Sequence, residues 1–155
     1  MKISLWCIGK TNETYLKSGM DIYFKRLKHY CDFEYMEWKD VGHFTNSEDL
    51  MRKEAIMILG KLKEDDYLIL LDEKGQKNDS IGFSTSLERL QIQSVKHVVF
   101  LIGGAFGHHQ SIRTRAQKML SLSEMTFSHQ MIRLIFAEQL YRAFTILKNE
   151  KYHNP

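Results

Sequence analysis

Hydrophobic positions along the chain follow two alternating periods. Short apolar runs at residues 2–8, 67–71 and 97–102 have the length of buried strands, and residues 33–38 alternate apolar with acidic side chains as a half-buried strand does. Between these runs, apolar residues recur every three or four positions, as on one face of a helix. This alternation predicts an α/β fold in which helices cover both faces of a parallel sheet.

The same patterns give approximate bounds for the remaining elements. We expect helices from residue 11 or 12 to 27, from 46 or 47 to 62, across 83–90, across 112–119, and from Ser128 to about Lys148. A polar loop is expected at 72–79, and a short extended or irregular segment at 120–127. Because no repeat, low-complexity stretch or linker interrupts the pattern, residues 1–155 are predicted to form a single domain.

The last predicted helix is apolar around most of its circumference. Its apolar residues are Met131, Ile132, Leu134, Ile135, Phe136, Ala137, Leu140, Tyr141, Ala143, Phe144, Ile146 and Leu147. Such a helix is buried on several sides, either by the sheet alone or by the sheet and a second subunit. Because a domain of 155 residues has little room to bury a terminal helix completely, the pattern favours a homodimer.

Composition and charge narrow the functional classes. With 43% hydrophobic and 26% charged residues, the chain has the composition of a soluble globular domain. The longest apolar run is too short for a membrane span and the N-terminal run too short for a signal peptide, so we expect a cytoplasmic protein without a membrane partner.

The charge is unevenly distributed along the chain. Residues 101–155 carry a net charge of +4 and residues 1–100 carry −1. The basic end indicates either an anionic partner such as RNA or a solvated helix surface.

Candidate chemistry lies after two of the predicted strands, at 72–76 and 103–107. In parallel sheets ligands bind beyond the carboxyl ends of the strands, and glycines let a ligand approach the bare backbone. Gly103, Gly104 and Gly107 therefore favour a ligand site over a simple tight turn. No G-x-G-x-x-G follows the first strand and no phosphate-binding P-loop motif occurs, which argues against both nucleotide-binding classes. The histidines lack the spacing of metal ligands, so no metal site is expected.

Several segments together resemble one enzyme family. They are the turn Leu101–Gly107, the segment Leu120–His129, the helix with Arg133, Glu138, Gln139, Tyr141 and Arg142, the ending Tyr152-His153, the start Lys2–Leu5 and the loop Leu71–Gly75. These features are similar to the ribosomal large-subunit pseudouridine N3-methyltransferases, which belong to the SPOUT class. The resemblance covers the whole chain.

The resemblance implies properties that patterning cannot supply. It implies a C-terminal trefoil knot that forms the cofactor pocket, a homodimer, and S-adenosylmethionine as the cofactor. It also implies methyl transfer to N3 of a pseudouridine in large-subunit (23S) rRNA, within assembled ribosomes. The cofactor contacts that it implies are Leu71, Gly103, Gly104, Leu122, Ser123, Glu124, Met125, Thr126 and Phe127. A side chain placed at Gly103 is expected to fill the pocket.

The catalytic candidates are Tyr152, His153 and Arg142. The resemblance implies that Tyr152 and His153 lie beside the methyl donor. Arg133 and Arg142 could hold phosphate or the base carbonyls, although Arg142 could instead form only an i,i+4 salt bridge with Glu138. Since the C-terminal residues are polar, we expect the tail to be mobile without RNA and to close over the target base. Three positions depart from the family pattern, namely His108, Ser128 and Asn154. The alternatives are a SPOUT methyltransferase that acts on tRNA and a non-catalytic nucleotide-binding or ribosome-binding module.

Overall fold

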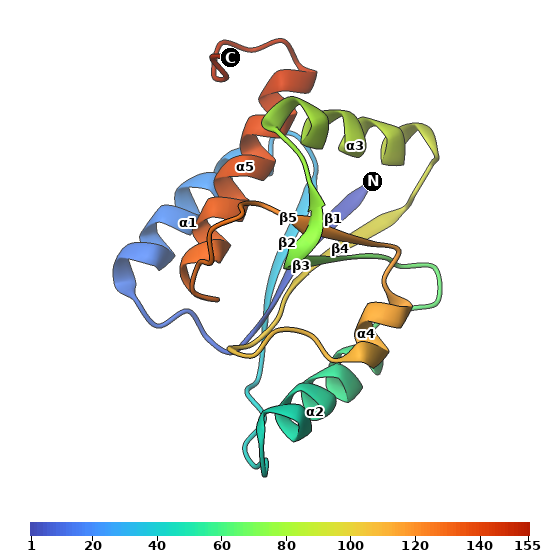
Figure 1. Ribbon diagram of the computed structural model, residues 1–155. Helices are drawn as coiled ribbons and strands as arrows, with labels where there is room; N and C mark the ends of the chain where they lie inside the picture. The colour runs from blue at the N-terminus through green and yellow to red at the C-terminus, as the bar shows by residue number, and fades with distance from the viewer.

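A computed structural model describes residues 1–155 and contains a five-stranded sheet (Figure 1). The strands are β1 (Lys2–Ile8), β2 (Asp32–Trp38), β3 (Tyr67–Lys77), β4 (His97–Ile102) and β5 (Lys118–Ser121). Their order in the sheet is β2-β1-β4-β3-β5, and every pair of neighbours is parallel. The prediction of a parallel α/β fold is confirmed.

Helices cover both faces of this sheet (Figure 1). They are α1 (Thr14–Leu27), α2 (Ser47–Leu59), α3 (Ser80–Ile92), α4 (Gln110–Arg115) and α5 (Met131–Leu147). Because side chains alternate along a strand, Leu5 and Cys7 of β1 join the core under α1, α3 and α5, whereas Trp6 and Ile8 join the core under α2 and α4. None of the helices combines the length and the apolar character needed to cross a bilayer.

Strand β3 differs from the sequence-based prediction, which ends it at Leu71 and assigns 72–79 to a loop. It continues to Lys77, and the register shifts so that both Leu71 and Gln76 lie opposite Leu120 of β5. Gly75 permits this crossing, because an ideal Cβ on it would lie 2.6 Å from the Leu120 backbone nitrogen. The extension is polar and lies beyond the buried core, so no hydrophobic pattern marks it as a strand.

Two other bounds are also corrected. Met119, predicted to lie in the short helix, belongs to β5, since α4 ends at Arg115. The last helix begins at Met131 rather than directly after Ser128, although the Ser128 hydroxyl does accept a hydrogen bond from the Met131 N–H at 3.0 Å. The predicted order of five strands alternating with five helices is otherwise confirmed.

Helix α5 packs between α1 and α3 on one face of the sheet (Figure 1). Gly19 lets α1 approach closely, because an ideal Cβ there would lie 2.9 Å from Leu134 Cδ1 of α5. Phe136, Ala137 and Leu140 of α5 are completely buried, whereas many of the other apolar residues of the helix are only half-buried within a single chain.

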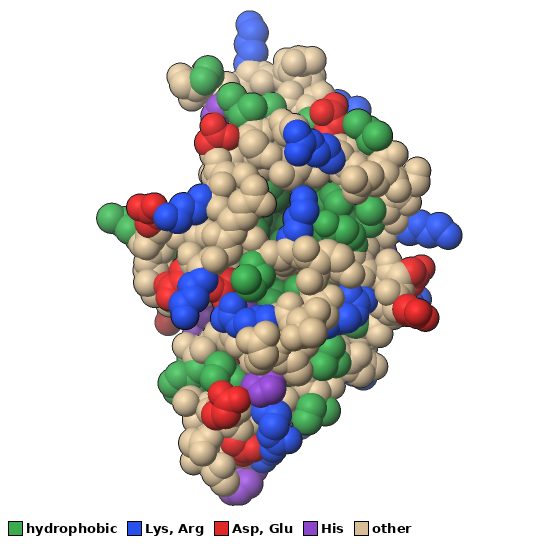
Figure 2. Space-filling model, turned by 45° about the vertical axis from the view of Figure 1, so that its right-hand side comes forward, with side chains coloured by type: hydrophobic (Ala, Val, Ile, Leu, Met, Phe, Trp, Pro, Cys, Tyr) green, Lys and Arg blue, Asp and Glu red, His purple; other side chains and the backbone are tan.

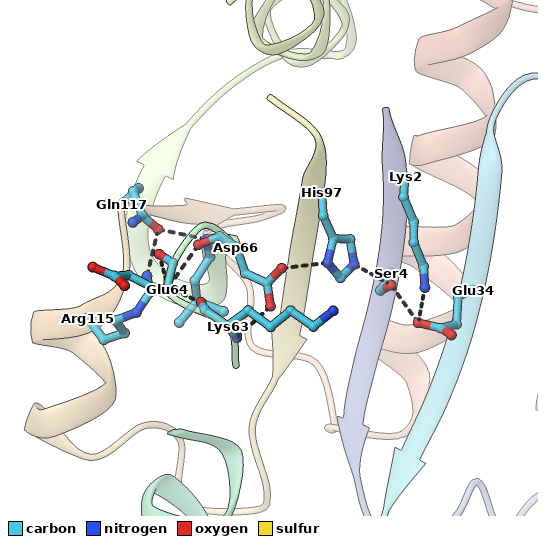
Figure 3. A network of polar contacts seen from close by, with 10 residues as sticks. Lys2, Ser4, Glu34, Lys63, Glu64, Asp66, His97, Arg115 and Gln117 are labelled. Carbon is cyan, nitrogen blue, oxygen red and sulfur yellow. Dashed lines mark hydrogen bonds and ion pairs between the residues drawn. The ribbon is translucent and has the colours of Figure 1, made fainter. Parts of the chain in front are cut away.

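A polar network joins the amino ends of the strands (Figure 3). It lies at the opposite end of the strands from the loops that follow β4 and β5. Ser4 Oγ donates to Glu34 Oε2 at 2.8 Å and lies 2.8 Å from His97 Nε2, and His97 Nδ1 lies 2.7 Å from Asp66 Oδ1. Lys2 Nζ completes the network 3.1 Å from Glu34. Although a serine, a histidine and an aspartate are connected here, Ser4 is fully buried and cannot meet a substrate. The network therefore holds β1, β2 and β4 to the start of β3.

We predict that His97→Ala lowers the free energy of unfolding by about 2 kcal/mol. The variant removes one of the two partners of the side chain of Asp66, a residue that is 4% exposed, and one partner of the buried Ser4 hydroxyl. Urea denaturation followed by circular dichroism would measure the change. The control is His29→Ala, because His29 is exposed and its replacement should change stability by less than about 0.5 kcal/mol. Equal stability of the two variants would contradict a structural role for the network.

Candidate functional site

A cavity of about 330 Å³ lies at the carboxyl ends of β4 and β5, beside the polar extension of β3. Leu71, Ile102 and Leu120 line it from the three strands, together with residues 72–74 of the β3 extension and the loops that follow β4 and β5. Small-molecule sites commonly have volumes of about 300–1,000 Å³, so this cavity suits a single ligand of moderate size. Its position agrees with the sequence-based prediction of a ligand site after the strands ending at 71 and 102.

The first wall is the glycine-rich loop after β4, which turns sharply and is held by its own backbone. The Gly107 N–H donates to the Gly104 carbonyl at 3.2 Å, and Gly107 has a positive φ of 85°. An ideal Cβ on Gly103 would lie 3.0 Å from the Gly107 carbonyl oxygen and 3.1 Å from His108 Cε1. A side chain at Gly103 would therefore press on the loop that forms this wall.

The second wall is the loop after β5, which is fastened to the extension of β3. Thr126 Oγ1 donates to Glu73 Oε2 at 2.8 Å, and Lys77 forms an ion pair with Glu124. Because Glu124 is turned outward to this ion pair, its side chain is 75% exposed and does not line the cavity.

Two side-chain contacts stabilise the part of the cavity that β3 forms. His108 Nε2 lies 3.0 Å from the Leu71 carbonyl oxygen, and burial lowers the pKa of His108, so the neutral ring donates its Nε2–H to that oxygen. Arg113 of α4 pairs with Asp72, with 2.6 Å between Arg113 Nη2 and Asp72 Oδ2. The chain therefore carries a charge pair where the polar extension of β3 begins.

His129 also lines the cavity and is held from behind by α5. The fully buried Arg133 donates from Nε to the His129 carbonyl at 3.0 Å and from its other nitrogens to the carbonyls of Ile8 and Gly9. Burial, together with the positive charge of Arg133, lowers the pKa of His129. The imidazole of His129 is thus kept neutral near pH 7.

The structure brings together almost all of the residues predicted to contact the cofactor. Leu71, Gly103, Gly104, Leu122, Ser123, Met125, Thr126 and Phe127 line the cavity, and Glu124 does not. The sequence-based prediction did not include Lys74, Phe106, Arg113, His129 and Ile132, which line it too. Lys74 and Phe106 lie inside the two loops that the glycines mark, whereas the positions of Arg113 and Ile132 depend on helix packing that no local motif reveals.

The predicted catalytic residues form a separate cluster at the end of α5. The Arg142 guanidinium donates to Glu138 Oε1 at 2.6 and 3.0 Å, so the i,i+4 salt bridge considered for this pair does form. The Tyr152 hydroxyl donates to the same oxygen at 3.2 Å, and His153 Nδ1 accepts from Arg142 at 3.3 Å. None of Arg142, Tyr152 and His153 lines the cavity of their own chain.

The tail packs against α5 more closely than its polar sequence suggests. The ring of Tyr152 lies 4.7 Å from that of Tyr141 in an edge-on arrangement, and the Arg142 guanidinium lies 4.7 Å from the centre of the Tyr152 ring. Burial raises the pKa of Tyr152, as do hydrogen bonding to Tyr23 and the charge of Glu138. Tyr152 is therefore a hydrogen-bond donor at neutral pH and not a base.

Comparison with known proteins identifies the family of the chain. Residues 1–153 match the family model described as "Predicted SPOUT methyltransferase". The protein named "Ribosomal RNA large subunit methyltransferase H" in Cytophaga hutchinsonii is 46% identical over 155 residues, which cover 99% of this chain and 100% of the relative. The proteins with the same name in Flavobacterium johnsoniae and Parabacteroides distasonis are 47% and 46% identical, with 99% of each chain covered. The chain belongs to the SPOUT methyltransferase family.

Proposed function

We propose that this protein transfers a methyl group from S-adenosylmethionine to N3 of a pseudouridine in large-subunit (23S) rRNA. The observation that carries the proposal is the cavity beside β3, β4 and β5, because three of the segments that resemble the pseudouridine N3-methyltransferases contribute residues to it, namely Leu71–Gly75, Leu101–Gly107 and Leu120–His129. Full-length relatives named as large-subunit rRNA methyltransferases support the RNA substrate.

The residues around the cavity fit S-adenosylmethionine. Leu122, Ile132 and Ile102 offer apolar side chains to a purine ring, and the bare backbone at Gly103 offers polar groups. Hydroxyl groups of Ser123 and Thr126 and the carboxylate of Glu73 supply the polar contacts that a ribose and an amino group need. When bound, this cofactor supplies a methyl group already activated by its sulfonium.

The chemistry left to the protein is positioning and proton removal. Transfer requires the methyl carbon and the N3 atom to be held in line, which a closed pocket achieves by orientation. The N3 proton must leave before or during attack. Because Tyr152 keeps its own proton, we assign it to hold the base by hydrogen bonding, with Arg142 supporting it. His153 would accept the proton once its Nδ1, which here accepts a hydrogen bond from Arg142, is released.

The target base would enter past an apolar rim. Phe106, Met125 and Phe127 line the cavity while remaining 58%, 77% and 38% exposed. Aromatic rings at such a rim stack on bases, and Lys and Arg side chains lie among hydrophobic ones across the middle of the face in Figure 2, where they would contact phosphates. These features favour an RNA substrate that is partly unstacked.

We also propose that the chain ends in a trefoil knot and works as a homodimer. The close crossing of Gly75 and Leu120, with the loop after β5 fastened to Glu73 and Lys77, supports a chain threaded at this place. In a dimer, the tail of a second copy can reach the cavity that the chain's own tail does not line. A role on the ribosome implies a cytoplasmic location.

We predict a homodimer with a mass of about twice 18.3 kDa in sedimentation equilibrium at micromolar concentration. The physical reason is the incompletely buried apolar surface of α5, together with Tyr15 and Ile22 of the adjacent α1, which are 60% and 51% exposed. A clean monomer at this concentration would contradict the prediction.

The test of the proposed function uses radiolabelled S-adenosylmethionine with intact ribosomes, isolated large subunits, naked 23S rRNA and tRNA. We expect label in large-subunit rRNA, recovered by nucleoside mass spectrometry as N3-methylpseudouridine. Label in tRNA alone would support the alternative SPOUT enzyme, and cofactor binding without transfer to any RNA would support a non-catalytic module.

A further inference from the structure

A buried carboxyl group lies directly behind the glycine-rich wall of the cavity. Glu54 of α2 is 6% exposed, and an ideal Cβ on Gly104 would lie 2.6 Å from Glu54 Oε1 and 3.1 Å from the other carboxylate oxygen. Glu54 forms no ion pair, and the neighbours of its helical face are Met51, Ala55 and Ile58. Burying a carboxyl group without a cation lowers the stability of the fold, so a functional role for Glu54 is worth examining.

The carboxylate lies against the backbone of Gly104, where an added Cβ would meet both of its oxygens. Burial raises the pKa of Glu54 to about 7 and the charge of Asp40 contributes in the same direction, whereas hydrogen bonding to the Gly104 backbone opposes the rise. Gly104 is in turn bonded to Gly107 across the turn, so a group that fixes Gly104 fixes the whole wall.

We propose that Glu54 is a positioning residue whose carboxylate holds Gly104, and with it the glycine-rich wall, in the form that binds the methyl donor. This inference rests on the proposed function, because it concerns the affinity for S-adenosylmethionine. Glu54 itself does not line the cavity and touches no reacting atom.

The charged and titratable groups around Glu54 determine the expected pH dependence. Asp40 faces it from the loop after β2, and the neutral His108 and the Glu48-bound His109 face it from the loop before α4. As the pH falls from 8.5 to 6, Glu54 takes up a proton and becomes a weaker acceptor for the Gly104 amide. Affinity for the donor should therefore fall with falling pH.

The experiment measures S-adenosylmethionine binding to the full chain by calorimetry at pH 6, 7 and 8.5. For the wild type we expect Kd to be about tenfold higher at pH 6 than at pH 8.5. Glu54→Gln retains an oxygen acceptor without the charge, so its Kd should be intermediate and nearly independent of pH. Any titration of S-adenosylmethionine itself affects the wild type and Glu54→Gln equally, so it does not contribute to the difference between them. Glu54→Ala should raise Kd about tenfold or more at pH 8.5.

Two further measurements separate positioning from general stability. In methylation assays, Glu54→Gln should raise KM for the donor and leave kcat nearly unchanged. Gly104→Ala should raise Kd severalfold in the wild-type background, where its methyl group meets the carboxylate, and much less in the Glu54→Ala background. The matched control is Glu48→Gln on the same helix, whose carboxylate is 68% exposed and which should bind as the wild type does.

The outcomes are distinguishable. If the wild type binds S-adenosylmethionine but Glu54→Gln keeps the full pH dependence, the inference is overturned while the proposed function stands. An equal effect of Gly104→Ala in both backgrounds, or an effect of Glu48→Gln as large as that of Glu54→Gln, also overturns it. If the wild type does not bind S-adenosylmethionine at all, the proposed function fails and the inference with it. Glu54→Gln preserves the shape of the side chain, so the test does not depend on whether Glu54→Ala folds.

Discussion

Gly103→Val is expected to abolish binding of S-adenosylmethionine, with a loss of affinity of about 100-fold or more. The Cβ alone would lie 3.0–3.2 Å from Gly107 and His108, and the two methyl groups of valine add volume where the loop has no free space. The loop must therefore move, and it forms one wall of the proposed cofactor site. Calorimetry measures the affinity, and circular dichroism checks that the sheet remains folded.

Two variants control this prediction. Gly42→Val makes the same substitution in an exposed loop where an added Cβ meets nothing within 4 Å, so it should bind as the wild type does. Gly103→Ala requires a shift of only a few tenths of an ångström and should lose affinity severalfold, which keeps the test informative if the valine variant unfolds. Unchanged affinity in a folded Gly103→Val protein would remove Gly103 from the site.

The fold was predictable because the hydrophobic period changes cleanly between strands and helices. Runs such as Leu68–Leu71 and Val98–Ile102 are buried on both faces of the sheet, so every side chain in them is apolar. The extension of β3 was missed because it carries polar side chains outside the core. Its only sign in the sequence is Gly75, whose meaning depends on the backbone of β5 passing beside it.

The candidate site was predictable where one local rule sufficed. Glycine-rich loops after buried strands indicate the carboxyl-end edge of the sheet, and the predicted loops do line the cavity there. Glu54 was not predicted by this rule, because it lies on α2 and contacts the glycine-rich loop from outside the cavity. A signal for it does exist, since Glu54 occupies the apolar face of α2 together with Met51, Ala55 and Ile58, where an acidic residue is out of place.

Deletion of residues 152–155 is expected to reduce methyl transfer to ribosomes by about 100-fold or more while changing the affinity for S-adenosylmethionine by less than about twofold. The two effects should separate because the tail contacts Glu138, Tyr141 and Arg142 and lines no part of the cavity in its own chain. Single-turnover methylation of ribosomes and calorimetry with the free cofactor measure them independently. Deletion of only Asn154 and Pro155, which are exposed, should leave both quantities near their wild-type values.

Single substitutions then assign the roles within the tail. Tyr152→Phe keeps the ring packed on Tyr141 but removes the hydroxyl that reaches Glu138, so it should lower the rate if Tyr152 holds the base by hydrogen bonding. His153→Ala should lower the rate if His153 accepts the N3 proton. If the truncated protein methylates at close to the full-length rate, the tail has no catalytic part. The proton acceptor must then be sought at His129, which lines the cavity and is held neutral beside Arg133.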